Sequence, residues 1–167
     1  MKGISVAPTL YVESSIVSYL RSRPSGHVIS AARQLVTQRW WVTERHNYQL
    51  LISQYVIDEI SKGDPILAQE RMTIVADIPV IGINDELSNL AETFLEATLL
   101  PPRARLDALH ICAAVIGGVD YLLTWNCTHI ANARTLPRVH DFFAQLGHSF
   151  PVVCTPEELL DDEYPIT

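Results

Sequence analysis

Four polar residues have side chains suited to a cation-dependent active site: Glu13, Glu59, Asp107 and Asn126. They offer carboxylate and amide oxygens, which are the ligands that hard cations such as Mg²⁺ and Mn²⁺ prefer. One or two such ions can make a water nucleophilic and stabilise charge on a phosphate. The chemistry indicated is therefore phosphodiester hydrolysis, with these four residues as candidate metal ligands and catalytic groups.

Each carboxylate also has a simpler explanation. Asp107 opens an almost wholly apolar helix, so its charge needs compensation by a cation, an arginine or the first-turn amides of its own helix. Glu59 is adjacent to Asp58, and the two must face different ways on a helix, so one of them is expected to be solvated. Glu13 ends a core strand, where a cap or turn would more naturally use Asp or Asn. Both explanations stay open for each residue.

Short apolar strands alternate with helical segments along the chain. Strands are predicted at residues 9–12, 48–52, 78–83, 120–124 and 150–154, and helices at 16–20, 27–45, 54–61, 66–76, 85–98, 103–116, 136–146 and from 156 onward. Ser53, Asn84 and Thr155 are predicted helix caps. Such alternation is typical of a three-layer α/β/α fold with a central, mainly parallel sheet. Because no linker or repeat interrupts it, residues 1–167 are expected to form a single domain.

The predicted fold places some of the polar residues at one edge of the sheet. In open parallel sheets, ligands bind beyond the carboxyl ends of the strands. Glu13 directly follows the first strand, and Thr124 and Asn126 end and follow the fourth. His110 is three residues after Asp107, so it is either a packing histidine or a residue lining the same helix face.

The composition is that of a globular protein, with 48% hydrophobic and 19% charged residues and a net charge of −7. This charge counts against a broadly basic nucleic-acid surface, although cations bound to a carboxylate cluster reverse the local field. The arginines occur in groups, which are either phosphate contacts or parts of solvated helix faces. The groups are Arg21, Arg23, Arg33 and Arg39; Arg103 and Arg105; and Arg134 and Arg138. We take Arg103 and Arg105 as candidate contacts to substrate phosphate.

Other site types find little support. The three cysteines form no CxxC pair, so reduced thiols are expected, and Cys127 with His129 lacks partners for a zinc site. No Walker, G-x-G-x-x-G or G-x-S-x-G pattern occurs. The apolar N-terminal run is interrupted by Pro8 and Glu13, and no segment reaches the ~20 apolar residues of a membrane span. A cytoplasmic protein is expected.

Four segments resemble the successive motifs of PIN domains: LYVESS at 10–15, VIDEI at 56–60, DALH at 107–110 and YLLTWN at 121–126. Their order and separation fit the family over nearly the whole chain. The segment from Leu106 to Ala133 is similar to an uncharacterised bacterial branch related to the VapC-type ribonuclease toxins.

The resemblance implies an acidic Mg²⁺ or Mn²⁺ site, endoribonuclease activity on RNA, and often a homodimer inhibited by an antitoxin protein. By position it implies that Glu13, Glu59, Asp107 and Asn126 take the four acidic places, with the hydroxyls of Ser15 and Thr124 supporting them. Two departures from the family pattern stand out. The first acidic residue is usually Asp, and the fourth, often Asp, is here a neutral Asn. We expect weaker cation binding than in a site with four acidic residues.

Two other functions remain possible from the sequence. A PIN fold with weak catalysis that acts as a binding or assembly module would fit the two departures and the net charge of −7. A structure-specific DNA nuclease is the other, since related folds cut DNA flaps, but the chain has no obvious additional DNA-clamping element.

Overall fold

The central element is a sheet of five parallel strands in the order β3-β2-β1-β4-β5, seen in a computed structural model that describes residues 6–161. The strands are β1 (Thr9–Val12), β2 (Gln49–Ser53), β3 (Val80–Ile81), β4 (Tyr121–Leu123) and β5 (Val152–Cys154). The first strand is central, with Tyr11 paired to Leu51 on one side and to Leu122 on the other. The chain therefore starts in the middle of the sheet and builds outward in both directions.

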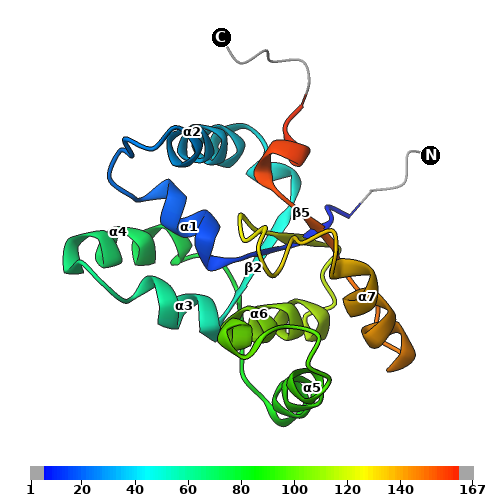
Figure 1. Ribbon diagram of the computed structural model, residues 1–167. Helices are drawn as coiled ribbons and strands as arrows, with labels where there is room; N and C mark the ends of the chain where they lie inside the picture. The colour runs from blue at the N-terminus through cyan, green and yellow to red at the C-terminus, as the bar shows by residue number, and fades with distance from the viewer. Residues whose placement is uncertain (1–5, 162–167) are drawn as a thin grey trace.

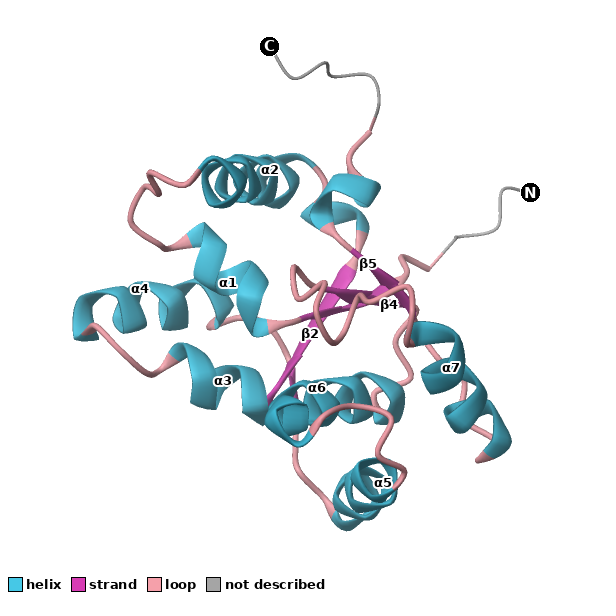
Figure 2. Cartoon of the chain, viewed as in Figure 1, coloured by secondary structure: helices cyan, strands magenta, loops and turns pink. Residues whose placement is uncertain are grey.

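Helices cover both faces of this sheet. The α-helices are α1 (Ser14–Leu20), α2 (Val28–Thr43), α3 (Gln54–Ile60), α4 (Pro65–Val75), α5 (Asp85–Glu96), α6 (Arg105–Ile116) and α7 (Leu136–Gln145). Short 3₁₀ helices η1 (Arg45–Asn47), η2 (Pro102–Ala104) and η3 (Pro156–Leu159) complete the set. In Figure 1, α1, α2 and α4 lie on one side of the strands and α5, α6 and α7 on the other. The three-layer α/β/α fold with a parallel sheet is thus confirmed, and Figure 2 shows the strands enclosed between helices.

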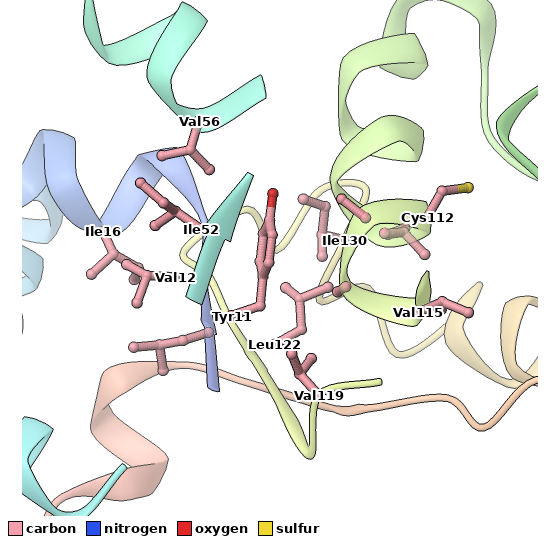
Figure 3. Packing of buried hydrophobic residues seen from close by; sticks show 14 of the residues in the cluster. Tyr11, Val12, Ile16, Ile52, Val56, Cys112, Val115, Val119, Leu122 and Ile130 are labelled. Atoms are coloured by element: carbon pink, nitrogen blue, oxygen red, sulfur yellow. The ribbon is translucent and has the colours of Figure 1, made fainter. Parts of the chain in front are cut away.

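The core is continuous through the sheet, because side chains alternate between its two faces. Leu10, Tyr11 and Val12 of β1 are completely buried. Figure 3 shows the Tyr11 ring between β2 and α6, with its oxygen at the end toward which the β2 arrow points. The almost wholly apolar helix that Asp107 opens is α6, and it is largely buried: residues such as Ile111 and Cys112 are buried, and α5 packs on its outer side.

Most predicted elements occur with ends shifted by one or two residues, but the third strand keeps only its two middle residues and the last helix is shorter and of another type. The third strand was predicted over residues 78–83, but only Val80 and Ile81 pair, at the edge of the sheet. The last predicted helix is a single 3₁₀ turn within the described residues, at whose start Glu158 accepts hydrogen bonds from the Thr155 amide and hydroxyl. The N-terminal run begins in residues 1–5, outside the described part. Between residues 6 and 161 no helix has the length and apolar character required to cross a membrane.

Candidate active site

Glu13 lies at the carboxyl end of the central strand and is only 4% exposed. Its backbone N–H continues the sheet ladder to the Leu123 carbonyl, which fixes the residue between β1 and β4. Its Oε1 accepts hydrogen bonds from the Ser14 hydroxyl (2.5 Å) and the Ser15 amide (3.1 Å). Its Oε2 accepts from the hydroxyls of Ser15 and Thr124, the latter at 2.7 Å. Four donors therefore hold this carboxylate in one orientation.

Glu59 reaches the same place from α3. The Ser14 Oγ that contacts Glu13 also lies 2.6 Å from Glu59 Oε2, so a single hydroxyl joins the two carboxylates. Burial alone would raise the pKa of Glu59, but hydrogen bonds from His110 and Ser14 outweigh it and hold this pKa below its usual value. Glu59 is therefore ionised at neutral pH. Asp58, by contrast, is exposed and bonds only to Gln54 among the described residues.

A buried chain of hydrogen bonds supports Glu59 from the interior. His110 Nε2 lies 2.6 Å from Glu59 Oε2, and its Nδ1 lies 2.8 Å from the Tyr11 hydroxyl. The Tyr11 hydroxyl in turn lies 2.7 Å from Ser53 Oγ. The prediction that the Ser53 side chain caps α3 is wrong, because its hydroxyl bonds to Tyr11 instead. Burial raises the pKa of Tyr11 well above its usual value, so the phenol keeps its proton.

Asp107, in the first turn of α6, has a histidine partner of its own. Its Oδ2 lies 2.8 Å from His129 Nδ1, and its side chain is 21% exposed. The other ring nitrogen, His129 Nε2, is buried and has no hydrogen-bond partner among residues 6–161. Asp107 therefore has a histidine as its hydrogen-bond partner, which was not among the three compensating groups expected from the sequence.

Asn126 follows β4 and shapes the loop beyond it. Its side-chain Oδ1 accepts a hydrogen bond from the His129 backbone N–H (3.1 Å), and its backbone N–H donates to the Thr124 hydroxyl (2.9 Å). The Thr124 hydroxyl in turn donates to Glu13. Ser15 makes a similar link, since its hydroxyl accepts from the Trp125 amide (2.9 Å) and donates to Glu13. Ser15 and Thr124 thus join the β4 loop to the Glu13 carboxylate.

The predicted site residues fall into two groups. Oxygens of Glu13 and Glu59 and a nitrogen of His110 all lie within 4.8 Å of one another, an arrangement that could hold a metal ion. Asp107 does not belong to this cluster, and it and Asn126 each form a hydrogen bond with His129. Sequence reasoning did not assign Tyr11, Ser14 or His129 to the site. For His110, the spacing of three residues from Asp107 was the only signal.

Two arginine groups differ in what surrounds them. The candidate phosphate contacts are both exposed, Arg103 in η2 and Arg105 at the start of α6. Arg33 on α2 lies over the Trp125 ring, 5.1 Å from its centroid, and its guanidinium is 4.0 Å from the Cys127 sulfur. Arg33 has no carboxylate partner among residues 6–161. It is therefore a preorganised, unneutralised cation beside the loop that carries Asn126.

Comparison with solved structures identifies the fold. VapC20 of Mycobacterium tuberculosis, described as a sarcin-ricin loop cleaving toxin, matches 75% of this chain and 95% of its own with a TM-score of 0.59 and 16% identity. VapBC-1 of nontypeable Haemophilus influenzae matches 89% and 98% with a TM-score of 0.54 and 11% identity. VapBC2 of Rickettsia felis, bound to a promoter DNA fragment, matches 88% and 98% with a TM-score of 0.51 and 11% identity.

No protein-family model matches the sequence, and a comparison with curated proteins also finds no match. The structural likenesses nevertheless cover most of the chain, and the three matched structures are one VapC toxin and two VapBC proteins. The chain therefore has the fold of the VapC toxins, as the resemblance to PIN domains predicted. At these identities the likeness defines the fold, and the chemistry has to be argued from the residues.

Proposed function

We propose that this protein is a metal-dependent endoribonuclease that hydrolyses phosphodiester bonds of single-stranded or structured RNA at the Glu13–Glu59 site. The observation that carries the proposal is the hydroxyl shared by these two carboxylates. Ser14 has one proton, yet its Oγ lies 2.5 Å from Glu13 Oε1 and 2.6 Å from Glu59 Oε2. Ser14 can therefore donate to only one of the two carboxyl groups at a time. The site is therefore short of positive charge, and a divalent cation would supply it.

The donor set fits Mg²⁺ or Mn²⁺. Glu13 and Glu59 offer carboxylate oxygens, and we infer that Asp107 and Asn126 complete the ligands from the adjoining loop and helix. Such an ion would place positive charge beside the scissile phosphate and the attacking water. The protein's own contribution is orientation: Ser15 and Thr124 hold Glu13, while Arg33, Arg103 and Arg105 offer positive charge to phosphates further along the RNA. These arginines would provide positive charge near the site although the net charge of the protein is −7.

The first test is cleavage of labelled single-stranded and hairpin RNAs by the purified chain. We expect endonucleolytic products with millimolar Mn²⁺ or Mg²⁺ and none after EDTA treatment, with activity restored when metal is added back. Flap DNA serves as the comparison substrate, and preferential cleavage of it would favour a DNA nuclease. Absence of cleavage on every substrate, by protein whose Mn²⁺ binding is measured in parallel, would contradict a nuclease function.

Asn126 gives a second prediction, about cation affinity. The Asn126→Asp variant keeps an oxygen to accept the His129 amide and adds one negative charge near the cation. We therefore expect it to bind Mn²⁺ about tenfold more tightly, a gain of ~1.4 kcal/mol. Titration calorimetry of the two proteins at equal ionic strength measures the difference. Equal affinities would remove Asn126 from the ligand set.

A second function, a binding module with weak catalysis, is favoured by one observation: the Asn126 side-chain oxygen is already engaged by the His129 amide. The Asn126 oxygen would then have to share its lone pairs between this hydrogen bond and the cation, and it would be a weaker fourth ligand. Such a module would bind a protein partner stably and cleave no RNA at millimolar Mn²⁺. The cleavage assay above separates the two functions.

We also propose an antitoxin partner, a homodimer and a cytoplasmic location. Two of the proteins with this fold are named VapBC, and VapC20 is described as a toxin. On α2 the side chains of Val28, Leu35 and Val42 follow one another at intervals of seven residues and are 82%, 69% and 71% exposed. Apolar residues at this spacing form one stripe along a helix and suit packing against another helix.

A further inference from the structure

We propose that His110, held by Tyr11, is a positioning residue that orients Glu59 for cation binding through an Nε2–H hydrogen bond and does not itself bind the metal. The inference rests on the proposed metal site and adds to it a residue role. By position alone His110 could be a metal ligand, since one of its ring nitrogens lies within 4.8 Å of oxygens of Glu13 and Glu59.

The direction of the buried hydrogen bonds argues for donation. Tyr11 and Ser53 are completely buried and His110 is 1% exposed, so each of their polar atoms must find its partner inside the protein. The ionised Glu59 carboxylate can only accept, so in a neutral imidazole the 2.6 Å contact places the proton on His110 Nε2. We therefore assign the Tyr11 phenol as the donor to Nδ1 and the Ser53 hydroxyl as the donor to the Tyr11 oxygen.

A Tyr11–His110 hydrogen bond in the opposite direction, with Nδ1 of a neutral imidazole as the donor, is less favourable. If His110 Nδ1 donated to Tyr11, the Nε2 lone pair would face the lone pairs of Glu59 Oε2 at 2.6 Å. A cation placed at Nε2 would also have to displace this hydrogen bond. The arrangement therefore uses the imidazole as a donor to a carboxylate ligand, a common way in which proteins orient the groups that bind a metal.

The consequence for Glu59 is that its two oxygens are made different. His110 and Ser14 both contact Oε2, whereas Oε1 has no hydrogen-bond partner among residues 6–161. Rotation of the carboxylate is thereby restricted, and Oε1 is left as the oxygen available to a cation. Because Tyr11 belongs to the central strand, the hydrogen bonds from Ser53 through Tyr11 and His110 connect Glu59 to the centre of the sheet.

The first test reads the tautomer directly by long-range ¹H–¹⁵N NMR of the histidine side chains. We expect His110 to carry its proton on Nε2 in the metal-free protein and to keep it after saturation with Mg²⁺. In Mn²⁺-loaded protein, electron spin-echo spectroscopy should detect no directly coordinated ¹⁴N from His110. Loss of the Nε2 proton on metal binding, or a coordinated nitrogen that disappears in His110→Gln, would overturn the proposal.

The second test measures Mn²⁺ affinity by calorimetry in variants. His110→Leu should lose about 10-fold or more, and His110→Gln, whose amide can still donate, should lose less. Tyr11→Phe removes one oxygen and should weaken binding in the same direction by a smaller factor. Tyr55→Phe is the matched control: its ring packs edge-on against the same imidazole, and no hydrogen bond joins the two side chains.

The outcomes are distinguishable from those for the nuclease. Native affinity in both His110→Leu and Tyr11→Phe would overturn the positioning role. Because Tyr11→Phe is a small change, it keeps the test valid if His110→Leu fails to fold. A native protein that binds Mn²⁺ but cuts no RNA would contradict the proposed nuclease and leave this inference standing, since both tests read the metal site without RNA.

Discussion

Glu13→Gln is expected to reduce Mn²⁺-dependent RNA cleavage by at least about a thousandfold, which corresponds to ~4 kcal/mol of transition-state stabilisation. Glu13 is the most tightly held carboxylate of the site, with both oxygens accepting hydrogen bonds from the Ser14–Ser15 turn and from Thr124. Glutamine has nearly the same shape, but it removes one of the two charges that face the Ser14 hydroxyl. It thereby removes the excess of negative charge that would attract the cation.

The same change should also lower stability in the metal-free protein. The side-chain amide of glutamine has only one accepting oxygen, so its NH₂ group would face hydroxyls that now donate to a carboxylate. A buried donor placed against other donors costs about 1–3 kcal/mol. We therefore expect a lower melting temperature for Glu13→Gln in EDTA, measured by circular dichroism.

The matched control for this prediction is Glu92→Gln, the same chemical change at an exposed position on α5. It should cleave RNA at the native rate and melt at the native temperature. If Glu13→Gln, shown to be folded at the assay temperature, cleaves within about threefold of the native rate, the Glu13 carboxylate has no part in catalysis, and the site would have to be sought elsewhere.

Much of the fold could be predicted because the relevant signals are local. The run of Thr9–Val12 coincides with β1, and the cap at Asn84 coincides with the start of α5, where its side chain accepts from the Leu87 amide. The third strand was predicted too long because apolar residues favour a strand whether or not a neighbour pairs with them. At the sheet edge only Val80 and Ile81 have a pairing partner, on β2.

The site could be predicted only in part, because it depends on how helices pack across the sheet. The strand-end rule brought Glu13 and Thr124 to one edge, and they do bond to each other. Whether His110 is a packing residue or a site residue depends on where α3 lies against α6, and no periodicity in the sequence contains that information. The same holds for Ser53, whose position before a helix predicted a cap although its hydroxyl is used by Tyr11.

Asp107→Asn is the second change expected to have a large effect, a loss of roughly 100-fold in cleavage rate, or ~2.7 kcal/mol of transition-state stabilisation. His129 explains why the amide cannot replace the carboxylate. The Nδ1 of His129 faces Asp107 Oδ2 at 2.8 Å, so its proton lies on that nitrogen, and an asparagine would turn its oxygen toward it. The NH₂ group would then occupy the place of Oδ1, and an amide nitrogen is not a ligand for Mg²⁺ or Mn²⁺.

This variant also decides between two positions for the cation. If the ion is bound by Glu13 and Glu59 with Asp107 as a further ligand, Asp107→Asn should weaken Mn²⁺ binding together with cleavage. If Glu13, Glu59 and His110 alone formed the site, as their 4.8 Å grouping would allow, the same variant would bind Mn²⁺ with native affinity. Calorimetry and cleavage assays on one protein preparation therefore test both alternatives.

The chain provides a matched control in Asp141→Asn, which makes the same change in an exposed pair, where Asp141 Oδ1 lies 3.6 Å from His140 Nδ1. It should leave both Mn²⁺ affinity and cleavage at native values. Thermal unfolding of the two variants in EDTA checks that the difference between them does not come from stability. Cleavage by Asp107→Asn at the rate of its control would show that the carboxylate serves only to pair with His129.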